Sequence, residues 1–392
     1  MKINKWTQVL LGVGLVSIPA VTHADEKEHL SSLRADLTST TISGYIDTSA
    51  TWKFGTGNAN MPGRVYDAAD TQDGFNLNVV SITFSKPLDE SEWSAGYNVQ
   101  TLLGPGAVKR GTRSIMGGPA GDFAFNEAVV LLRVPIGNGI DFKVGQFGTY
   151  NGYEAYDTYK NPNWSRSYGF FLESSAHTGI SASYRINDMI SIMAGIGNMA
   201  AFNNATDARY SQTISESEKA YLGMISFTAP ESFGFLEGAS LSIGYTGGKS
   251  TPTAQFMQEN YYVGLSLPTP VETVAVGVAF DYTTGIGGKD EEAGALGTYL
   301  LVQATEKLKI NTRLDYGWGD NGQYYAAKAG KKNQLLSLTV TADYSLWQNV
   351  ISRLEFRGDR ALTGGSPFGD DGTGAPNDRD AFSLTGNIIY QF

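Results

Sequence analysis

Hydrophobic and polar residues alternate one by one along most of this chain. Between Leu308 and Trp318, mostly apolar side chains occupy every second position, and Lys309, Arg313 and Asp315 occupy positions between them. The segments 42–54 and 350–359 follow the same pattern. A period of two residues is typical of β-strands whose two faces meet different surroundings.

The pattern predicts sixteen strands between residue 42 and the C-terminus. They average about eleven residues, the length that a tilted strand needs to cross a bilayer. The expected strands are 42–54, 74–85, 91–102, 123–134, 140–148, 177–186, 189–198, 218–229, 239–247, 259–267, 272–283, 295–304, 308–318, 334–345, 349–359 and 381–392. In the second of them the alternation changes phase near Val79 and Val80, which predicts a β-bulge.

The expected connections alternate between long and short. Those after the odd-numbered strands have at least eleven residues, and those after the even-numbered strands have at most nine. Outer-membrane barrels have short periplasmic turns and long extracellular loops. The predicted fold class is therefore all-β, a transmembrane antiparallel β-barrel of about 16 strands with both termini on the periplasmic side.

A soluble β-sandwich would also show alternation, but two features argue against it. One strand face carries Arg313, Asp315, Arg353 and Glu355, and charged side chains are seldom placed in a hydrophobic core. The apolar faces often end in aromatic residues, which is typical of the girdles that membrane proteins place at the lipid–water interface.

The N-terminus has the features of a secretory signal peptide. Lys2 and Lys5 precede the ten apolar residues 9–18, and small residues before Asp25 predict cleavage after Ala24. We therefore divide the chain into a signal peptide (1–24), a periplasmic segment that could form a short helix (25–41) and the barrel (42–392). Export combined with a barrel predicts the bacterial outer membrane as the location.

Composition excludes several classes of function. The absence of cysteine excludes thiol catalysis, disulfides and zinc–thiolate sites. A net charge of −10 argues against nucleic-acid binding. The chain has three histidines. One of them, His177, follows Ser174 and Ser175, but we interpret it as structural or solvated rather than catalytic. No enzyme activity, cofactor or resident metal is predicted, although the acidic loop 369–380 leaves calcium binding open.

Several short motifs resemble those of a known family. They are residues 142–147 (Phe-Lys-Val-Gly-Gln-Phe), residues 152–154 (Gly-Tyr-Glu) and residues 175–179 (Ser-Ala-His-Thr-Gly). The chain resembles the putative β-barrel porin-2, or OmpL-like, family over nearly all of its mature length. The last strand is similar to those of bacterial outer-membrane proteins, where a terminal Phe, here Phe392, serves as a signal to the barrel-assembly machinery. The resemblance implies an outer-membrane porin without catalytic residues.

A barrel of sixteen strands is wide enough for a water-filled lumen, and no plug domain precedes the first expected strand. We predict passive diffusion of small hydrophilic solutes and ions through a protein embedded in outer-membrane lipid. By analogy with general porins, a homotrimer is expected. A transporter of hydrophobic molecules and a structural or adhesive surface barrel remain as alternatives.

The third long loop, 149–176, is expected to fold inward and narrow the pore. It has 28 residues and is rich in aromatic side chains, including Tyr153, Tyr156, Tyr159 and Trp164. Outside the barrel these side chains would form an exposed apolar patch. An outward aromatic lid or a trimer contact is the alternative.

Charged residues on this loop and on the opposite wall suggest a site for ion selection. The expected constriction residues are Glu154 and Asp157 on the loop, and Lys309, Arg313, Arg353 and Arg357 on the wall. Acids facing bases across water would create a transverse field. The alternative is that each arginine pairs locally, for example Arg313 with Asp315 or Arg353 with Glu355. The sign of ion selectivity is left open.

Overall fold

The computed structural model describes residues 40–55, 60–64, 73–89, 93–110, 121–198, 200, 218–249, 256–328, 330–370 and 372–392. The predicted signal peptide and almost all of the predicted periplasmic segment lie outside the described residues, as does Asp371 of the acidic loop. In the part of the chain that is described, no helix is both long enough and apolar enough to cross a membrane.

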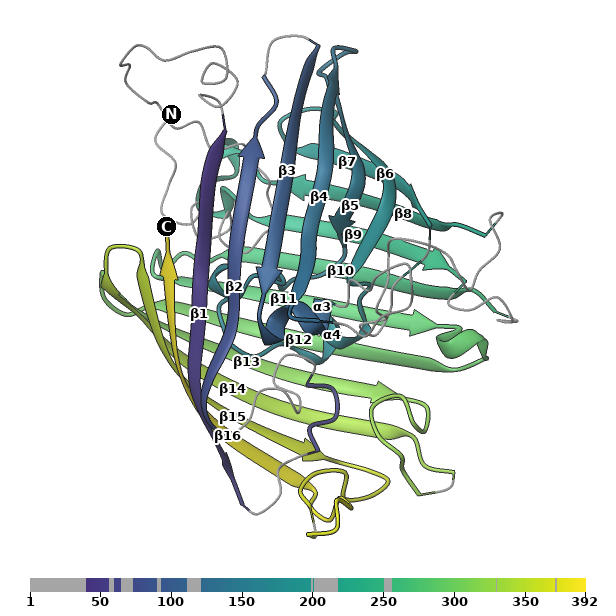
Figure 1. Cartoon of the computed structure of the whole chain (residues 1–392), viewed down its shortest axis with the longest axis vertical. Coiled ribbons are helices and arrows are strands. Elements are labelled where there is room, and N and C mark those ends of the chain that lie inside the picture. Colours follow the sequence, from purple (N-terminus) through teal and green to yellow (C-terminus); the bar gives the residue numbers. More distant parts are fainter. Residues whose placement is uncertain are drawn as a thin grey trace.

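Sixteen antiparallel strands form a closed barrel in which neighbours in the chain are neighbours in space, and β1 pairs with β16 (Figure 1). The strands are β1 (Thr41–Phe54), β2 (Gly74–Lys86), β3 (Ser94–Leu103), β4 (Phe123–Val134), β5 (Ile140–Gly148), β6 (Ala176–Arg185), β7 (Ile190–Gly197), β8 (Ala220–Thr228), β9 (Ser240–Gly248), β10 (Gln258–Pro268), β11 (Val274–Thr284), β12 (Glu292–Gln303), β13 (Leu308–Gly319), β14 (Asn333–Trp347), β15 (Val350–Ala361) and β16 (Asp380–Gln391). The predicted fold class is confirmed.

Short helices lie in the connections between strands. They are α3 (Pro105–Arg110), η1 (Thr158–Lys160), α4 (Tyr168–Leu172), η2 (Glu231–Leu236) and η3 (Ile286–Gly288). The helix α3 packs against β2, β3 and β4, and α4 packs against β11, β12 and β13. Two long loops, those after β3 and β5, therefore contribute elements that contact the barrel wall.

The strand boundaries differ from the expected ones by only a few residues. The predicted bulge in β2 is present: Asp47 of β1 lies opposite Val79 and Thr48 lies opposite Leu77, so Asn78 is the extra residue. The loop after β11 is shorter than expected, because β12 begins at Glu292 and its pairing with Thr284 continues the ladder. The turn after β8 is longer than expected because it contains η2.

The two faces of the barrel differ as the alternation predicts. Large apolar side chains such as Trp52, Val144, Leu314 and Tyr390 are exposed on the outer face. The inner face is lined by polar residues, most of them buried. A membrane-embedded barrel needs this arrangement, because its outer face meets lipid and its inner face does not.

The two ends of the barrel chain close the sheet against each other. The backbone N–H of Gly44 in β1 donates to the carbonyl of Phe392 at 2.9 Å, and the N–H of Phe392 donates to the carbonyl of Gly44 at 3.0 Å. The Phe392 ring stacks with Tyr390 and covers Gly44. This location is compatible with an assembly signal at Phe392, which stays a prediction.

Gly44 is required at this closure because the space for a side chain is filled. A Cβ on Gly44 would lie 2.2 Å from the backbone oxygen of Ser81 and 2.6 Å from a Phe392 ring carbon. We expect Gly44→Ala to destabilise the barrel by about 1–3 kcal/mol, the usual cost of overpacking. The measurement is the temperature at which the folded band on a semi-native gel is lost.

Gly386→Ala is the matched control on the partner strand β16. The nearest atom to its Cβ would be the oxygen of Ala50, 4.0 Å away. This variant should unfold at nearly the wild-type temperature. Equal loss of stability in both variants would contradict the role assigned to Gly44.

Candidate functional site

The loop that joins β5 to β6, residues 149–175, lies inside the barrel against its inner face. Every residue from Asn161 to Gly169 is buried. Its polar contacts are with lumen-facing side chains of several strands, including Asn260 of β10, Arg313 of β13 and Tyr45 of β1. We call residues 149–175 the inner loop.

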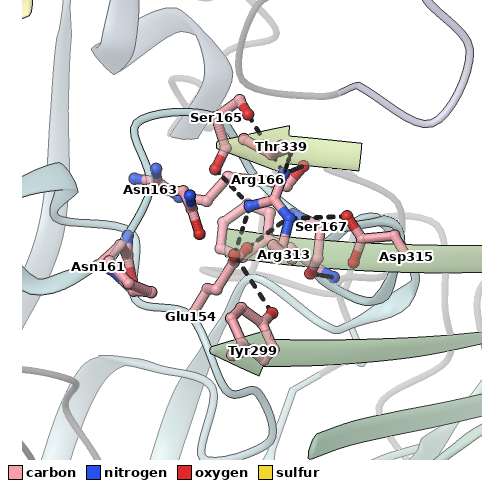
Figure 2. Close-up of polar contacts among 12 residues, drawn as sticks. Glu154, Asn161, Asn163, Ser165, Arg166, Ser167, Tyr299, Arg313, Asp315 and Thr339 are labelled. Carbon is pink, nitrogen blue, oxygen red and sulfur yellow. Dashed lines mark hydrogen bonds and ion pairs between the residues drawn. The ribbon is translucent and has the colours of Figure 1, made fainter. Parts of the chain in front are cut away.

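Arg313 is the main contact between the inner loop and the wall (Figure 2). Its guanidinium donates to Glu154 at 2.7 Å, to the carbonyl oxygen of Ser165 at 2.8 Å and to Asp315 at 2.7 Å. The side chains of Arg313, Glu154 and Asp315 are essentially unexposed. One wall cation thus holds an acid of the loop, an acid of its own strand and the loop backbone.

Glu355 on β15 provides a second anchor. Its carboxylate accepts hydrogen bonds from the backbone N–H groups of Trp164 and Ser165, at 2.6 and 3.0 Å, and from the Thr341 hydroxyl at 2.8 Å. Next to it, the Asn163 amide donates to Thr341 at 2.7 Å. The segment around Trp164 and Ser165 is therefore fixed through its backbone. Because any residue type supplies a backbone N–H, no sequence motif could predict this contact.

Two further wall arginines complete the attachment. Arg353 donates to Asp343 at 2.7 Å and to the carbonyl oxygens of Thr158 and Asn161, at 2.9 and 2.8 Å. Arg357 donates to Asp359 at 2.8 Å and to the carbonyl oxygen of Arg166 at 2.6 Å. Both arginines are buried.

The Asp359 carboxylate also accepts hydrogen bonds from residues of two loops. It accepts from the Tyr168 hydroxyl at 2.7 Å and from Arg64, which lies in the first long loop, at 2.9 Å. The alternation identified the faces of β15, but it gave no signal that residue 64, nearly three hundred positions away, would reach this carboxylate.

Three of the predicted constriction residues, Glu154, Asp157 and Lys309, have different surroundings in the structure. Glu154 is in direct contact with Arg313 rather than separated from it by water. Asp157 contacts β1 and β3 instead, where it accepts from the Tyr45 hydroxyl and the Gln100 amide, each at 2.9 Å. Lys309 faces the lumen opposite Asp343 in the register, and among the described residues no polar contact joins it to the inner loop.

The sequence also allowed each arginine to pair with a nearby acid of its own strand. The structure shows one of the two named pairs. Arg313 pairs with Asp315 as that alternative expected. Arg353 pairs with Asp343 on the neighbouring strand and not with Glu355, because Glu355 is occupied by the loop backbone.

The four aromatic residues singled out in the loop are buried or half-buried. Tyr153 stacks on Tyr299 of β12 with ring centroids 4.2 Å apart, and burial raises the pKa of its hydroxyl to about 12. Tyr159 meets Tyr45 edge to face at 5.0 Å. The Tyr156 hydroxyl donates to the carbonyl oxygen of Gly106 in α3, and Trp164 is fully buried.

A different set of lumen charges is reached by solvent. Lys143 on β5 lies 2.9 Å from Glu127 on β4, and Lys160 in η1 lies 2.8 Å from Asp157. The lysine side chains are 38% and 36% exposed, against 19% for Glu127 and 4% for Asp157. The register places Lys143 opposite Leu131 on the inner face, so its exposure means that water enters the lumen here. Sequence reasoning listed neither lysine as a site residue, although Lys143 lies within one of the family-like motifs.

The sequence also raised two other candidate sites, His177 with its neighbouring serines and the acidic loop 369–380. Ser174 Oγ and His177 Nε2 are 3.0 Å apart, but both residues are buried against the wall, which gives a substrate no access. Asp370 accepts hydrogen bonds from the backbone N–H groups of Gly372 and Gly374, as in a local turn. In the described part of the chain, no group of three acidic or histidine side chains is arranged to hold a metal.

The fold resembles those of known outer-membrane proteins. The anion-selective porin from Comamonas acidovorans matches with a TM-score of 0.58 at 12% identity, covering 90% of this chain and 99% of that one. OprB from Pseudomonas putida matches with a TM-score of 0.58 at 9% identity, covering 92% and 96%. The trimer form of OmpT from Vibrio cholerae matches with a TM-score of 0.55 at 13% identity, covering 90% and 99%.

Among curated proteins, no sequence matches this chain. A family model does match, and it covers residues 39–392, from just before β1 to the last residue. The sequence motifs, the closed barrel of sixteen strands and this match agree with one another. The chain belongs to the family described as Putative beta-barrel porin-2, OmpL-like.

Proposed function

We propose that this protein is an outer-membrane porin through which small hydrophilic solutes and ions diffuse passively. Membership of the family and the closed barrel support this proposal. The observation that carries it is the exposure of Lys143, a lumen-facing side chain in the membrane-spanning part of β5. A polar lumen reached by water is what a channel for hydrophilic solutes requires.

The inner loop narrows this channel in our proposal. It packs against β13, β14 and β15, where its contacts with Arg313, Thr341 and Glu355 are buried. Solvent reaches the opposite side, at Glu127 and Lys143. The water-filled path would therefore run past the exposed Glu127 and Lys143 of β4 and β5, with a smaller cross-section than the whole barrel.

Arg313, Arg353 and Arg357 act in this proposal as anchors of the constriction, together with Glu154. Each arginine is buried and donates both to an acid and to loop backbone. Charges neutralised in direct contact contribute little field to distant water. Their effect on permeation would then come from holding the loop in place.

A homotrimer in the outer membrane is the assembly we propose, by analogy with the trimer form recorded for the Vibrio cholerae OmpT. The barrel-assembly machinery and outer-membrane lipid would be its partners during and after insertion. The predicted signal peptide would direct its export.

Purified protein in planar lipid bilayers should produce stable, stepwise increases in ion current. Replacing residues 153–168 by a short Gly–Ser linker should enlarge each step clearly, because the replaced segment includes the residues that pack on β13 to β15. Gel mobility before and after heating would show that the variant is folded. Steps of unchanged size from a folded variant would disprove the constriction.

Arg313→Ala should loosen the inner loop. Glu154 and Asp315 would lose their buried cation, and breaking a buried ion pair typically costs about 3–5 kcal/mol. We expect a lower unfolding temperature together with noisier and larger current steps. Arg360→Ala is the matched control, because Arg360 pairs with Asp380 in an exposed position, where loss of a pair costs about 0–1 kcal/mol. Similar effects in both variants would contradict the anchoring role.

Raising the pH above the ordinary pKa of a glutamate should weaken the attachment of the loop near α4. Burial, then the nearby charges of Asp281 and Glu154, raise the pKa of Glu173 well above its ordinary value. The hydroxyl of Tyr262 on β10 also lies within electrostatic range of the Glu173 carboxyl group. Between the ordinary and the raised pKa, Glu173 holds a proton in the folded protein that the unfolded chain has released. The free energy of unfolding therefore falls as the pH rises through this window.

Glu173→Gln removes this titration and should make the dependence of unfolding temperature on pH shallower, measured from about pH 5 to about pH 9. Glu231→Gln, in exposed η2, is the control and should keep the wild-type slope. A wild-type slope in Glu173→Gln would exclude Glu173 as its source.

A further inference from the structure

We propose that Lys143 and Lys160 make this channel prefer anions, an inference that rests on the proposed porin function. Lys143 belongs to the wall at β5, and Lys160 belongs to η1 on the inner loop. The two ammonium groups lie within electrostatic range of each other, and Glu127 lies within range of both. A wall cation and a loop cation thus flank the side of the lumen that solvent reaches.

Each lysine is held in the same manner. Lys143 pairs with Glu127 and lies 5.9 Å from the centre of the Tyr150 ring. Lys160 pairs with Asp157 and lies 5.5 Å from the centre of the Tyr159 ring. An acid on one side and an aromatic face on the other fix the position of an ammonium group while leaving part of it in water.

The acids of the two pairs are also held by hydrogen-bond donors of the wall. Asp157 uses one carboxylate oxygen for the Tyr45 hydroxyl and the Gln100 amide, and the other for Lys160. Glu127 accepts from the Asn98 amide at 2.8 Å as well as from Lys143. Each acid is less exposed than the lysine it binds. A passing ion therefore meets ammonium groups before it meets carboxylates.

The two lysines and the charged side chains around them also carry a net positive charge. Arg110 of α3 is within electrostatic range of Asp157 and Glu127 and lies 5.0 Å from the centre of the Tyr156 ring. Among the described side chains here, Lys143, Lys160 and the buried Arg110 thus accompany the acids Glu127 and Asp157. Arg133 and Asp141, also on β4 and β5, form a pair of their own and add no net charge.

The buried arginines cannot supply this preference. The side chains of Arg64, Arg313 and Arg357 are unexposed, and that of Arg353 is 2% exposed. Like the two lysines, each of these arginines is paired with an acid at less than 3 Å, so exposure to water and not pairing distinguishes the lysines. Fixed charges select ions when they line the water path, and within a low-dielectric wall their field is focused into the path. Lys143 and Lys160 meet both conditions.

The test is the reversal potential of single channels in a gradient of potassium chloride. The wild type should prefer chloride. In Lys143→Gln with Lys160→Gln, the chloride-to-potassium permeability ratio should fall by about threefold for each lysine, the effect of one unit charge several ångströms from an ion in water. Lys143→Arg with Lys160→Arg keeps both charges and should retain the preference. Lys289→Gln, whose side chain is 72% exposed in the loop after β11, should not change it.

The outcomes separate this inference from the function on which it rests. Absence of stepwise currents in the folded wild type would overturn the porin proposal. Stable steps with an unchanged ratio in the double glutamine variant, or a wild type that prefers potassium, would overturn only the role of the two lysines. A shift in the glutamine variant combined with no shift in the arginine and Lys289 variants would establish it.

Discussion

The pairing of β1 with β16 is the constraint on which the rest of this structure depends. It leaves the sheet without an edge, so that every strand finds a partner on both sides. In lipid this is necessary, because an unpaired backbone N–H or carbonyl has no water to bind. The last residue takes part directly, since Phe392 exchanges two backbone hydrogen bonds with Gly44. Gly44 is tolerated there because it has no side chain to collide with the Ser81 carbonyl.

Closure places one face of every strand inside, and that face is rich in polar and charged groups. Buried charges are costly unless they are paired and hydrogen-bonded. The wall arginines meet this requirement with acids of the wall and with carbonyl oxygens of the inner loop. In turn, backbone N–H groups of the loop find their hydrogen-bond acceptor in the Glu355 carboxylate. The attachment of the loop and the neutralisation of the wall are thus one set of interactions.

The result is a lumen with two different sides. On β13 and β15 the charges of Arg313, Arg353 and Arg357 are compensated and inaccessible, whereas at β4 and β5 Lys143 and Glu127 are in contact with water. We interpret the first side as the support of the loop and the second as the path of the solute. In our two proposals, stability and selectivity are therefore assigned to different residues.

Period-two alternation determined the strand number, the strand order and the inner and outer faces, because each depends only on neighbouring residues and on a closed sheet. The bulge at Asn78 was also visible as a phase change near Val79. The length and aromatic content of 149–176 predicted that it folds inward, but not what it would contact. Tertiary structure alone brought Glu154 against Arg313, occupied Glu355 with loop backbone and left Lys143 and Lys160 in water. The physical reason is that these contacts depend on the path of an irregular loop across the lumen, which has no periodicity to read in the sequence.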